Sequence, residues 1–241
     1  MTLDEIAKID VTKPILQEGG NVLVYSSGKE IFALDKKPVK IAERENTVFS
    51  LCFHNGRLYD GGYYKSIFDT LSGVSVAERD NGMLALCSHN GKLYDGGEYM
   101  EVFETLVGES VIQRKSPITD LCSHEGRLYD TGDYCAVFDT LANRRVAKRE
   151  KRVLALCSHN GRLYDGGYSN SVIDTLANKP VAERTDTVFA LCSHEGRLYD
   201  SGYHKFVYDT LNPEAKLILT QMVSAMCSVP RKILVDAEKL K

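Results

Sequence analysis

The cysteines of this chain are equally spaced. Six of the seven fall on a lattice with a step of 35 residues, and only Cys135 lies off it: Cys52, Cys87, Cys122, Cys157, Cys192 and Cys227. The text around them repeats as well, with LCFHNGRLYDGG at residues 51–62 and LCSHNGKLYDGG at residues 86–97. A fixed period between about 20 and 50 residues is typical of a solenoid, a propeller or an array. This repeat limits the fold more than any other feature of the chain.

Each period reads as four short strands. In residues 153–184 the runs VLALCSH, RLYDGGY, SVIDTL and VAER concentrate the aliphatic, β-branched and aromatic residues that favour strands. Asn160 and Gly161 join the first two runs and supply the positive φ angles of a two-residue type I′ hairpin. Residues 177–180 form a further turn, between the third and fourth runs. Four antiparallel strands with short connections predict the blade of a β-propeller.

The number of blades follows from counting repeats. They start near residues 16, 51, 86, 121, 156, 191 and 226, and the first copy, within residues 12–45, is degenerate. Residues 5–10 resemble a fourth strand without a blade of its own. We therefore expect residues 1–241 to form one all-β domain, a seven-bladed β-propeller of four-stranded antiparallel blades. In it, residues 5–10 complete the last blade, so that N- and C-terminal strands close the ring. Six blades with an irregular clasp is the alternative.

The repeat resembles the WD40 repeat. The resemblance rests on the Ser-His-Asn-Gly-Arg-Leu hairpin, on the Gly-Gly at the end of the second strand, and on three pairs in place of that family's Trp-Asp: Phe68-Asp69, Phe138-Asp139 and Tyr208-Asp209. It covers nearly the whole chain. Two departures matter, because the chain has no Trp and lacks the family's Gly-His pair. The resemblance implies a propeller that serves as an interaction platform, and it implies no particular partner.

The composition excludes several classes of protein. A hydrophobic fraction of 43% and a charged fraction of 26% suit a globular domain. The formal net charge of -3 argues against a nucleic-acid binder, which needs a positive field. The start MTLDEIAKID has no apolar core typical of a signal peptide, and no stretch reaches the roughly 18 apolar residues that span a bilayer. We expect a cytoplasmic monomer that binds neither nucleic acid nor membrane.

Residues that recur in every blade are explained by the blade. Equivalent cysteines on neighbouring sheets are expected about 10 Å apart, too far for a disulfide, which indicates buried, reduced thiols. The hairpin histidines are expected too far apart to share an ion, so no metal and no cofactor is predicted. Pairing through the hairpin places Leu51 opposite Asp60, which predicts a row of partly buried carboxylates that need hydrogen-bond partners. The glycine that ends each second strand predicts a bulge or a close approach of blades.

Binding residues are sought where the repeat varies. In a four-stranded meander the second-to-third and fourth-to-first loops share one face of the disc, and here they differ from blade to blade. Exposed Tyr among charged residues is typical of binding hot spots. The alternative is that sequence drift accumulates in these loops. The candidate binding face comprises Tyr63, Tyr64, Lys65, Glu98, Tyr99, Asp133, Tyr134, Tyr168, Asn170, Tyr203 and His204.

Two local irregularities stand apart from the repeat. A run of cations on one outer strand and its exit loop is a candidate docking patch for an acidic partner, or else a solvated edge that discourages strand pairing. It comprises Arg144, Arg145, Lys148, Arg149, Lys151 and Arg152. Asp120 replaces the Ser or Ala found elsewhere on the inner strand. One carboxylate near a channel, without a matched base or nucleophile, gives no catalytic site.

Three functions follow as hypotheses. The first is a non-enzymatic platform that uses the variable face to hold a protein or peptide. The second is a multivalent carbohydrate-binding propeller, which predicts similar pockets in every blade and makes a sugar or other small molecule the ligand. The third is a hydrolase or lyase with its site at the central channel, although no nucleophile elbow or phosphate-binding loop supports it.

Overall fold

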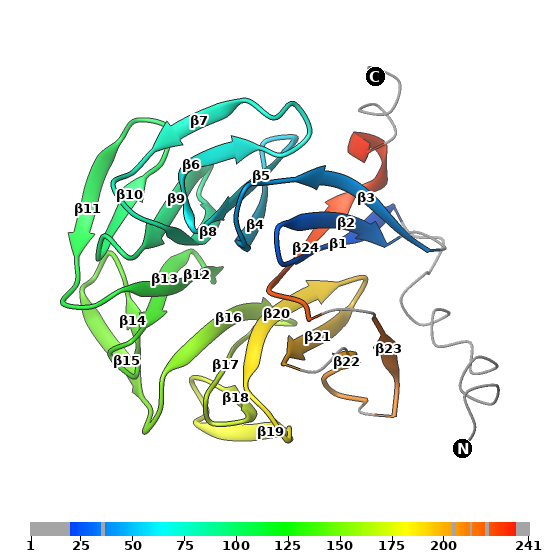
Figure 1. Cartoon of the computed structure of the whole chain (residues 1–241). Coiled ribbons are helices and arrows are strands. Elements are labelled where there is room, and N and C mark those ends of the chain that lie inside the picture. The colour runs from blue at the N-terminus through cyan, green and yellow to red at the C-terminus, as the bar shows by residue number, and fades with distance from the viewer. Residues whose placement is uncertain (1–19, 35–36, 204–205, 213, 220–221, 235–241) are drawn as a thin grey trace.

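The described residues form a ring of six four-stranded antiparallel sheets around a central axis (Figure 1). The computed structural model describes residues 20–34, 37–203, 206–212, 214–219 and 222–234. In five sheets the strands follow one another from the axis outward. These are β4(Val48–His54) to β7(Ser75–Glu78) through β5(Arg57–Gly62) and β6(Tyr64–Asp69), and β8(Met83–His89), β9(Lys92–Gly97), β10(Glu101–Glu104) and β11(Glu109–Gln113). The third is β12(Ile118–His124), β13(Arg127–Gly132), β14(Ala136–Asp139) and β15(Arg144–Lys148). The last two are β16(Val153–His159), β17(Arg162–Gly167), β18(Ser171–Asp174) and β19(Lys179–Glu183), then β20(Val188–His194), β21(Arg197–Gly202), β22(Phe206–Asp209) and β23(Lys216–Ile218).

The sixth sheet, called the closing sheet below, joins the two ends of the described chain. Its order is β24(Ala225–Pro230), β1(Asn21–Ser27), β2(Glu30–Leu34) and β3(Pro38–Glu43). Strand β24 is the innermost one and pairs with β1, so that Cys227 lies opposite Val24. The expected β-propeller of four-stranded blades is confirmed, the prediction of seven blades is wrong, and the six-bladed alternative is the one found.

The difference between the seven predicted blades and the six observed ones has a physical reason. The degenerate N-terminal repeat and the last C-terminal repeat were counted as two blades, but β24 supplies the inner strand that the first of them needs. Each satisfies the unpaired backbone edge of the other, so neither requires another strand. Residues 231–234 form a helical turn, whereas seven blades require a second strand at residues 232–235. Residues 5–10 and residue 16, which the seven-bladed count used, lie outside the described residues. Within the described part, no helix is long and apolar enough to cross a membrane.

The hairpins have the predicted register. Leu51 lies opposite Asp60 and Cys52 opposite Tyr59. Asn160 and Gly161 both have positive φ, of 47° and 70°, as a type I′ turn requires. At the other end of the hairpin, a Cβ on Gly62 would stand 2.0 Å from the carbonyl oxygen of Thr47. The close approach at this glycine is thus between two segments of one sheet and not between blades, while the shift in register between Val48 and Ser50 beside it bears out the predicted bulge.

Apolar side chains of neighbouring sheets pack into the layers between blades. In one layer Ile67 of β6 meets Met83 and Leu93 of the next sheet, and all three are fully or almost fully buried. Cys52 lies in the same layer, and burial raises the pKa of its thiol well above the usual value. Every cysteine in the described part is free. The repeated cysteines thus act as small apolar packing residues.

Two kinds of polar contact join successive sheets, a His-Ser contact and an Arg-Asp pair. The hairpin histidine donates or accepts through Nδ1 at Ser Oγ of the next sheet, 2.8 Å away for His54 and Ser88. The same contact recurs as His89 with Ser123, His124 with Ser158, His159 with Ser193 and His194 with Ser228. Burial lowers the pKa of His54. These histidines are cross-strand from the hairpin cations, as predicted, with His54 opposite Arg57.

The buried aspartates find their partner in an arginine that sequence reasoning did not assign to them. An Arg just after the fourth strand reaches the mid-strand Asp of the next sheet with both Nε and Nη2, at 2.9 and 2.5 Å for Arg149 and Asp165. The Asp side chain is only 1% exposed in this pair and the Arg side chain 8%. The five pairs are Arg44 with Asp60, Arg79 with Asp95, Arg114 with Asp130, Arg149 with Asp165 and Arg184 with Asp200.

The closing sheet departs from this scheme once on each side. At the junction between β23 and the closing sheet, the two positions of the Arg-Asp pair are occupied by Leu219 and Tyr25, which lie in one apolar cluster. At the junction between the closing sheet and β4, the two positions of the His-Ser contact are occupied by Val229 and Phe53, which lie in a second apolar cluster. At both contacts the two facing positions of the repeat carry apolar or aromatic residues, so that neither contact leaves one polar partner buried without the other.

Candidate functional site at the channel mouth

Six residues at one repeat position surround the mouth of the central channel. They begin the innermost strands, 35 residues apart, and each sheet contributes one: Phe49, Leu84, Thr119, Leu154, Phe189 and Ser224. Two positions further along the strand every residue is Leu or Met, so the chain keeps that position constant and varies this one. Four of the six are apolar, and two carry hydroxyls. We call these six residues the throat.

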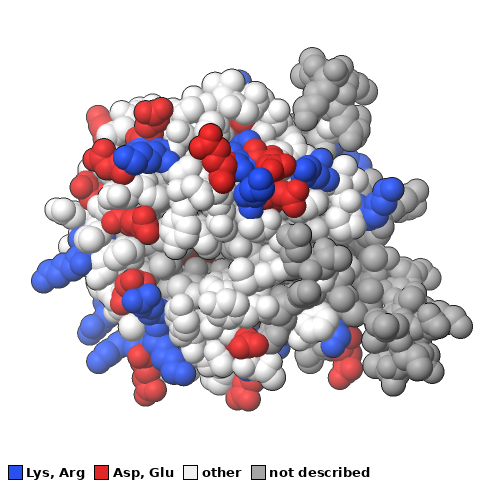
Figure 2. All heavy atoms as spheres, in the orientation of Figure 1, with Lys and Arg blue, Asp and Glu red and all other residues white. Residues whose placement is uncertain are grey.

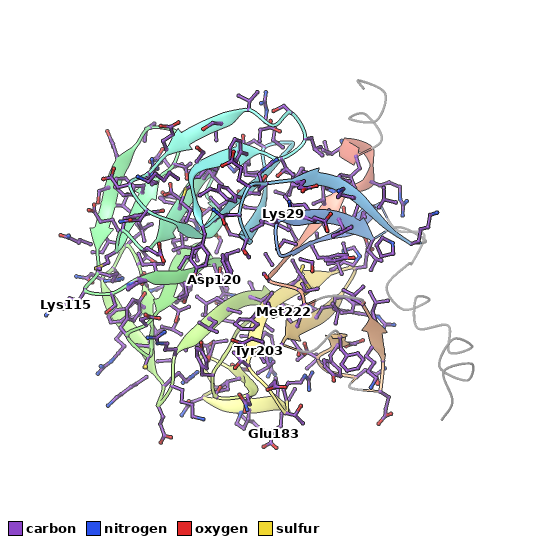
Figure 3. The ribbon with its side chains drawn as sticks, in the orientation of Figure 1. Lys29, Lys115, Asp120, Glu183, Tyr203 and Met222 are labelled. Carbon is purple, nitrogen blue, oxygen red and sulfur yellow. The ribbon has the colours of Figure 1, made fainter. Side chains whose placement is uncertain are left out.

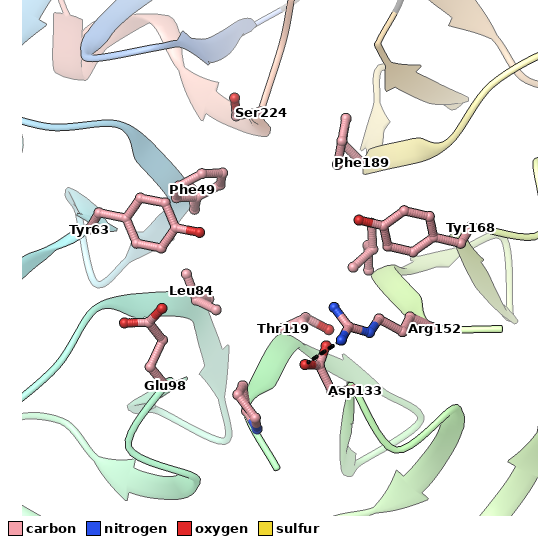
Figure 4. Close-up of a pocket in the computed structure, with 12 residues that line it drawn as sticks. Phe49, Tyr63, Leu84, Glu98, Thr119, Asp133, Arg152, Tyr168, Phe189 and Ser224 are labelled. Atoms are coloured by element: carbon pink, nitrogen blue, oxygen red, sulfur yellow. Dashed lines mark ion pairs between the residues drawn. The ribbon is translucent and has the colours of Figure 1, made fainter.

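Loops of the variable face raise a rim around the throat. Tyr63, Glu98, Asp133 and Tyr168 come from the second-to-third loops of four successive sheets, again at one repeat position. With Pro117 and Arg152 from the fourth-to-first loops they enclose a cavity of about 320 Å³ above the throat (Figure 4). Figure 2 shows a hollow over the middle of the ring with mainly uncharged walls, and acidic and basic side chains on the surrounding surface. The floor is thus apolar and the rim is mixed, as in a ligand pocket.

Contacts within the rim hold these side chains in place. Arg152 Nη2 lies 3.3 Å from Asp133 Oδ2 and forms an ion pair over the cavity (Figure 4). Glu98 accepts a hydrogen bond from the backbone N–H of Gly82 at 3.3 Å. Tyr63 packs edge-to-face on Phe49, with ring centroids 4.6 Å apart. Tyr63 nevertheless remains 53% exposed.

Three of the predicted face tyrosines point away from the cavity. Tyr64 donates a hydrogen bond to Asp60 at 2.6 Å, and Tyr99 and Tyr134 do the same to Asp95 and Asp130. Their rings lie against the Arg-Asp pairs, and burial raises the pKa of Tyr99 well above its usual value. These tyrosines complete the junctions between sheets. They do not line the mouth.

The remaining predicted face residues lie around the rim or outside it. Tyr203 is exposed and packs edge-to-face on Phe189, with centroids 4.5 Å apart, which supports the throat from outside. Asn170 has a positive φ and donates to the carbonyl oxygen of Thr185. Lys65 lies in a second, shallower groove with Glu98 and Met100. His204 lies outside the described residues.

The predicted basic patch divides between two roles. Arg144, Arg145, Lys148 and Lys151 are exposed on and just after β15. Arg149 is instead the buried partner of Asp165, and Arg152 turns toward the mouth and pairs with Asp133. Only four cations of the patch are therefore available on the outer edge.

Asp120 lines a smaller cavity of about 120 Å³ that meets the mouth at the throat. Its carboxylate accepts the backbone N–H of Leu121 at 2.8 Å and that of Leu156, on the next sheet, at 2.6 Å. Burial raises the pKa of Asp120 to about 7, against the lowering effect of these two N–H groups. Figure 3 places Asp120 close to the middle of the ring.

The throat was not among the predicted site residues, although a signal for it was present. Position by position, the repeat is constant at Leu51 and its equivalents but changes type at Phe49 and its equivalents. Drift in a loop does not explain a change of residue type at this position, because the inner strand fixes the side chain at the channel axis. No group of three or more His, Cys, Asp or Glu side chains in the described part is arranged to hold a metal ion.

Comparisons with known proteins show the fold. No protein-family model matches the chain, and no curated protein matches it in sequence. Among solved structures, it is similar to the WD40 β-propeller domain of Doa1, with a TM-score of 0.60 and 11% identity over 85% of this chain and 82% of that one. It is also similar to the computationally designed Ika8 protein, with a TM-score of 0.53 and 14% identity over 87% of this chain and 88% of that one.

Proposed function

We propose that this protein is a non-enzymatic platform that binds a short peptide segment of a protein partner at the channel mouth. One observation supports this most: the repeat loses its uniformity at the throat and the rim, where an apolar floor meets tyrosines and charged groups. A cavity of about 320 Å³ holds one or two side chains of a ligand. Rigid aromatic anchors beside charged groups are the features that dominate binding energy at protein interfaces.

The same observation disfavours a multivalent lectin. Such a propeller needs similar pockets at every junction between blades, whereas here the inner part of the junctions is filled by Arg-Asp pairs or apolar side chains and the outer loops differ from blade to blade. The described cavity lies on the axis, and its throat combines two Phe, two Leu, one Thr and one Ser. This suits one asymmetric ligand per ring.

The test is selection of binders from a library of random peptides displayed on phage. We expect the wild-type protein to enrich a related set of peptides. The double variant Tyr63→Ala, Tyr168→Ala should bind this set about tenfold more weakly or worse, because loss of a hot-spot side chain typically reduces affinity by 1 kcal/mol or more.

The matched control is the double variant Leu141→Ala, Leu176→Ala. These leucines are about as exposed as Tyr63, at 55% and 53%, but lie on third-to-fourth turns away from the mouth. The control should bind the selected peptides as the wild type does. Equal binding by the tyrosine variant would contradict the proposal, and binding of one sugar on a glycan array by both variants would favour the lectin.

A further inference from the structure

The cavity below the throat contains one carboxylate and no cation. Asp120 is its acidic residue, and its walls otherwise carry Leu, Ala, Met and Phe side chains with the hydroxyls of Ser50, Thr119 and Ser224. No Lys, Arg or His lines it among the described residues. Asp120 acts electrostatically on four thiols, those of Cys52, Cys87, Cys122 and Cys157. Burial raises the pKa of each thiol well above its usual value, so at neutral pH they supply no charge.

The buried aspartates elsewhere in the ring are all neutralised. Asp60 and its equivalents each meet an arginine, whereas Asp120 meets only two backbone N–H groups. Asp120 is half-buried where it faces the cavity, and an ionised carboxylate that is partly withdrawn from water without a counter-charge is unfavourable. The raised pKa of Asp120, about 7, reflects the same deficit. A cation brought into the cavity would remove it.

Other polar atoms in the same walls also lack partners. The hydroxyls of Ser50 and Ser224 are buried and have no hydrogen-bond partner, and each residue is only 6% exposed. Each oxygen of Asp120 receives one N–H and retains acceptor capacity. The Asp120 carboxylate therefore retains acceptor capacity in the wall of a cavity of about 120 Å³ that joins the mouth at the throat, while the two serine hydroxyls lie behind the surface of that wall.

We infer that the channel below the throat receives the ammonium group of a lysine side chain carried by the bound peptide, with Asp120 as its counter-ion. A compact ammonium group fits a cavity of about 120 Å³ that offers one carboxylate, whereas a planar guanidinium would bring five donors against the same apolar walls. The apolar throat, with Phe49, Leu154 and Phe189, suits the aliphatic stem of lysine. This inference rests on the proposed peptide platform and specifies the side chain that it reads.

The first test uses two small probes, Nα-acetyl-lysine methylamide and its uncharged analogue Nα-acetyl-norleucine methylamide. Binding is followed by the methyl NMR signals of Leu84, Thr119 and Leu154. We expect the lysine probe to shift these signals at a concentration that is lower than the norleucine probe requires by about tenfold or more. One desolvated ion pair would give a difference in affinity of this size. Lysine affinity should rise from pH 6 to pH 8, because Asp120 becomes fully ionised while lysine stays charged.

The matched variant is Asp120→Ala. It restores the residue that Ala85, Ala155 and Ala190 hold in other sheets, so the ring is expected to fold. The variant should bind both probes equally and without the pH dependence. A lysine preference that survives in Asp120→Ala, or equal responses of the wild type to both probes, would overturn the inference.

The peptide selection separates this inference from the proposed function. Selected peptides should contain a lysine in most members, and selection on Asp120→Ala should lose that enrichment. Peptides that depend on Tyr63 and Tyr168 but show no lysine enrichment overturn the channel site and leave the platform standing. No mouth-dependent peptides, together with a retained preference for the lysine probe, overturn the platform and leave the channel as a site for a free amine.

Discussion

At the scale of single residues, the ring is held by buried ion pairs that each span two sheets. The Arg149 guanidinium and the Asp165 carboxylate are both almost inaccessible to water. Taking two charges out of water is unfavourable, and their attraction offsets this only while both are present and their hydrogen bonds are complete. Thr175 adds one more hydrogen bond to Asp165, at 2.8 Å, as Thr210 does to Asp200, whereas a tyrosine donates to the equivalent aspartate in three other sheets.

We predict that Arg149→Leu destabilises the protein by about 3 to 5 kcal/mol, because it leaves Asp165 buried and unpaired. The double variant Arg149→Leu, Asp165→Tyr copies Leu219 and Tyr25 of the closing sheet and should be more stable than the single variant. Urea unfolding followed by circular dichroism measures both differences.

Arg144→Leu is the matched control, because Arg144 is exposed on the same sheet. Its effect should stay within about 0.5 kcal/mol of the wild type. A loss of less than 1 kcal/mol in Arg149→Leu would show that the buried pair contributes little to the junction.

At the scale of elements, the glycine at the end of each second strand sets how closely two chain segments approach. A Cβ on Gly202 would stand 2.0 Å from the carbonyl oxygen of Thr187, which no real packing allows. The segment that carries this carbonyl leads directly into β20 and to the throat residue Phe189. The glycine therefore fixes the start of an inner strand at the channel.

We predict that Gly202→Ala destabilises the protein by about 1 to 3 kcal/mol, the range expected when a well-packed site is forced apart. Gly20→Ala is the control, because nothing lies within 4 Å of a Cβ at that position and it should have little effect. Thermal unfolding of both variants measures this difference, and equal midpoints would contradict the prediction.

The sequence predicts these elements well because the repeat averages out local ambiguity. The hairpin register, the positive φ angles at Asn160 and Gly161, and the bulge beside the glycines are all legible from residue type and spacing. The candidate site is less accessible to such reasoning. Whether Tyr64 or Tyr63 faces the cavity depends on how one loop turns at the end of β5, and adjacent tyrosines offer no pattern to decide it.

At the scale of the whole molecule, the ring is closed by pairing the ends of the described chain. Strand β24 contributes Ala225 and Val229 to an apolar cluster with Val22 and Val24 of β1. The number of blades could not be read from the repeat count, since each terminal repeat alone looks like an incomplete blade. Only the pairing partner of β24 decides whether they are two blades or one.

We predict that a chain ending at residue 223 loses cooperative unfolding, because β1 then exposes its inner edge and its apolar face to water. A synthetic peptide of residues 224–234, added in trans, should restore a cooperative transition in differential scanning calorimetry. The same peptide with Val229→Asp is the control and should not restore it, since Val229 is fully buried. A cooperative transition without any peptide would show that closure is dispensable.

The unequal junctions also bear on how such a ring could change in size. The four junctions between β4 and β23 carry both the His-Ser contact and the Arg-Asp pair, while those of the closing sheet each carry one. A duplicated 35-residue unit inserted between β7 and β20 would therefore meet familiar neighbours on both sides. Duplication of the closing sheet would instead set Val229 against Ser228 and Arg44 against Tyr25, which places a polar group opposite an apolar or aromatic one at both contacts. Growth by gene duplication is thus permitted at the interior of the chain and blocked at its join.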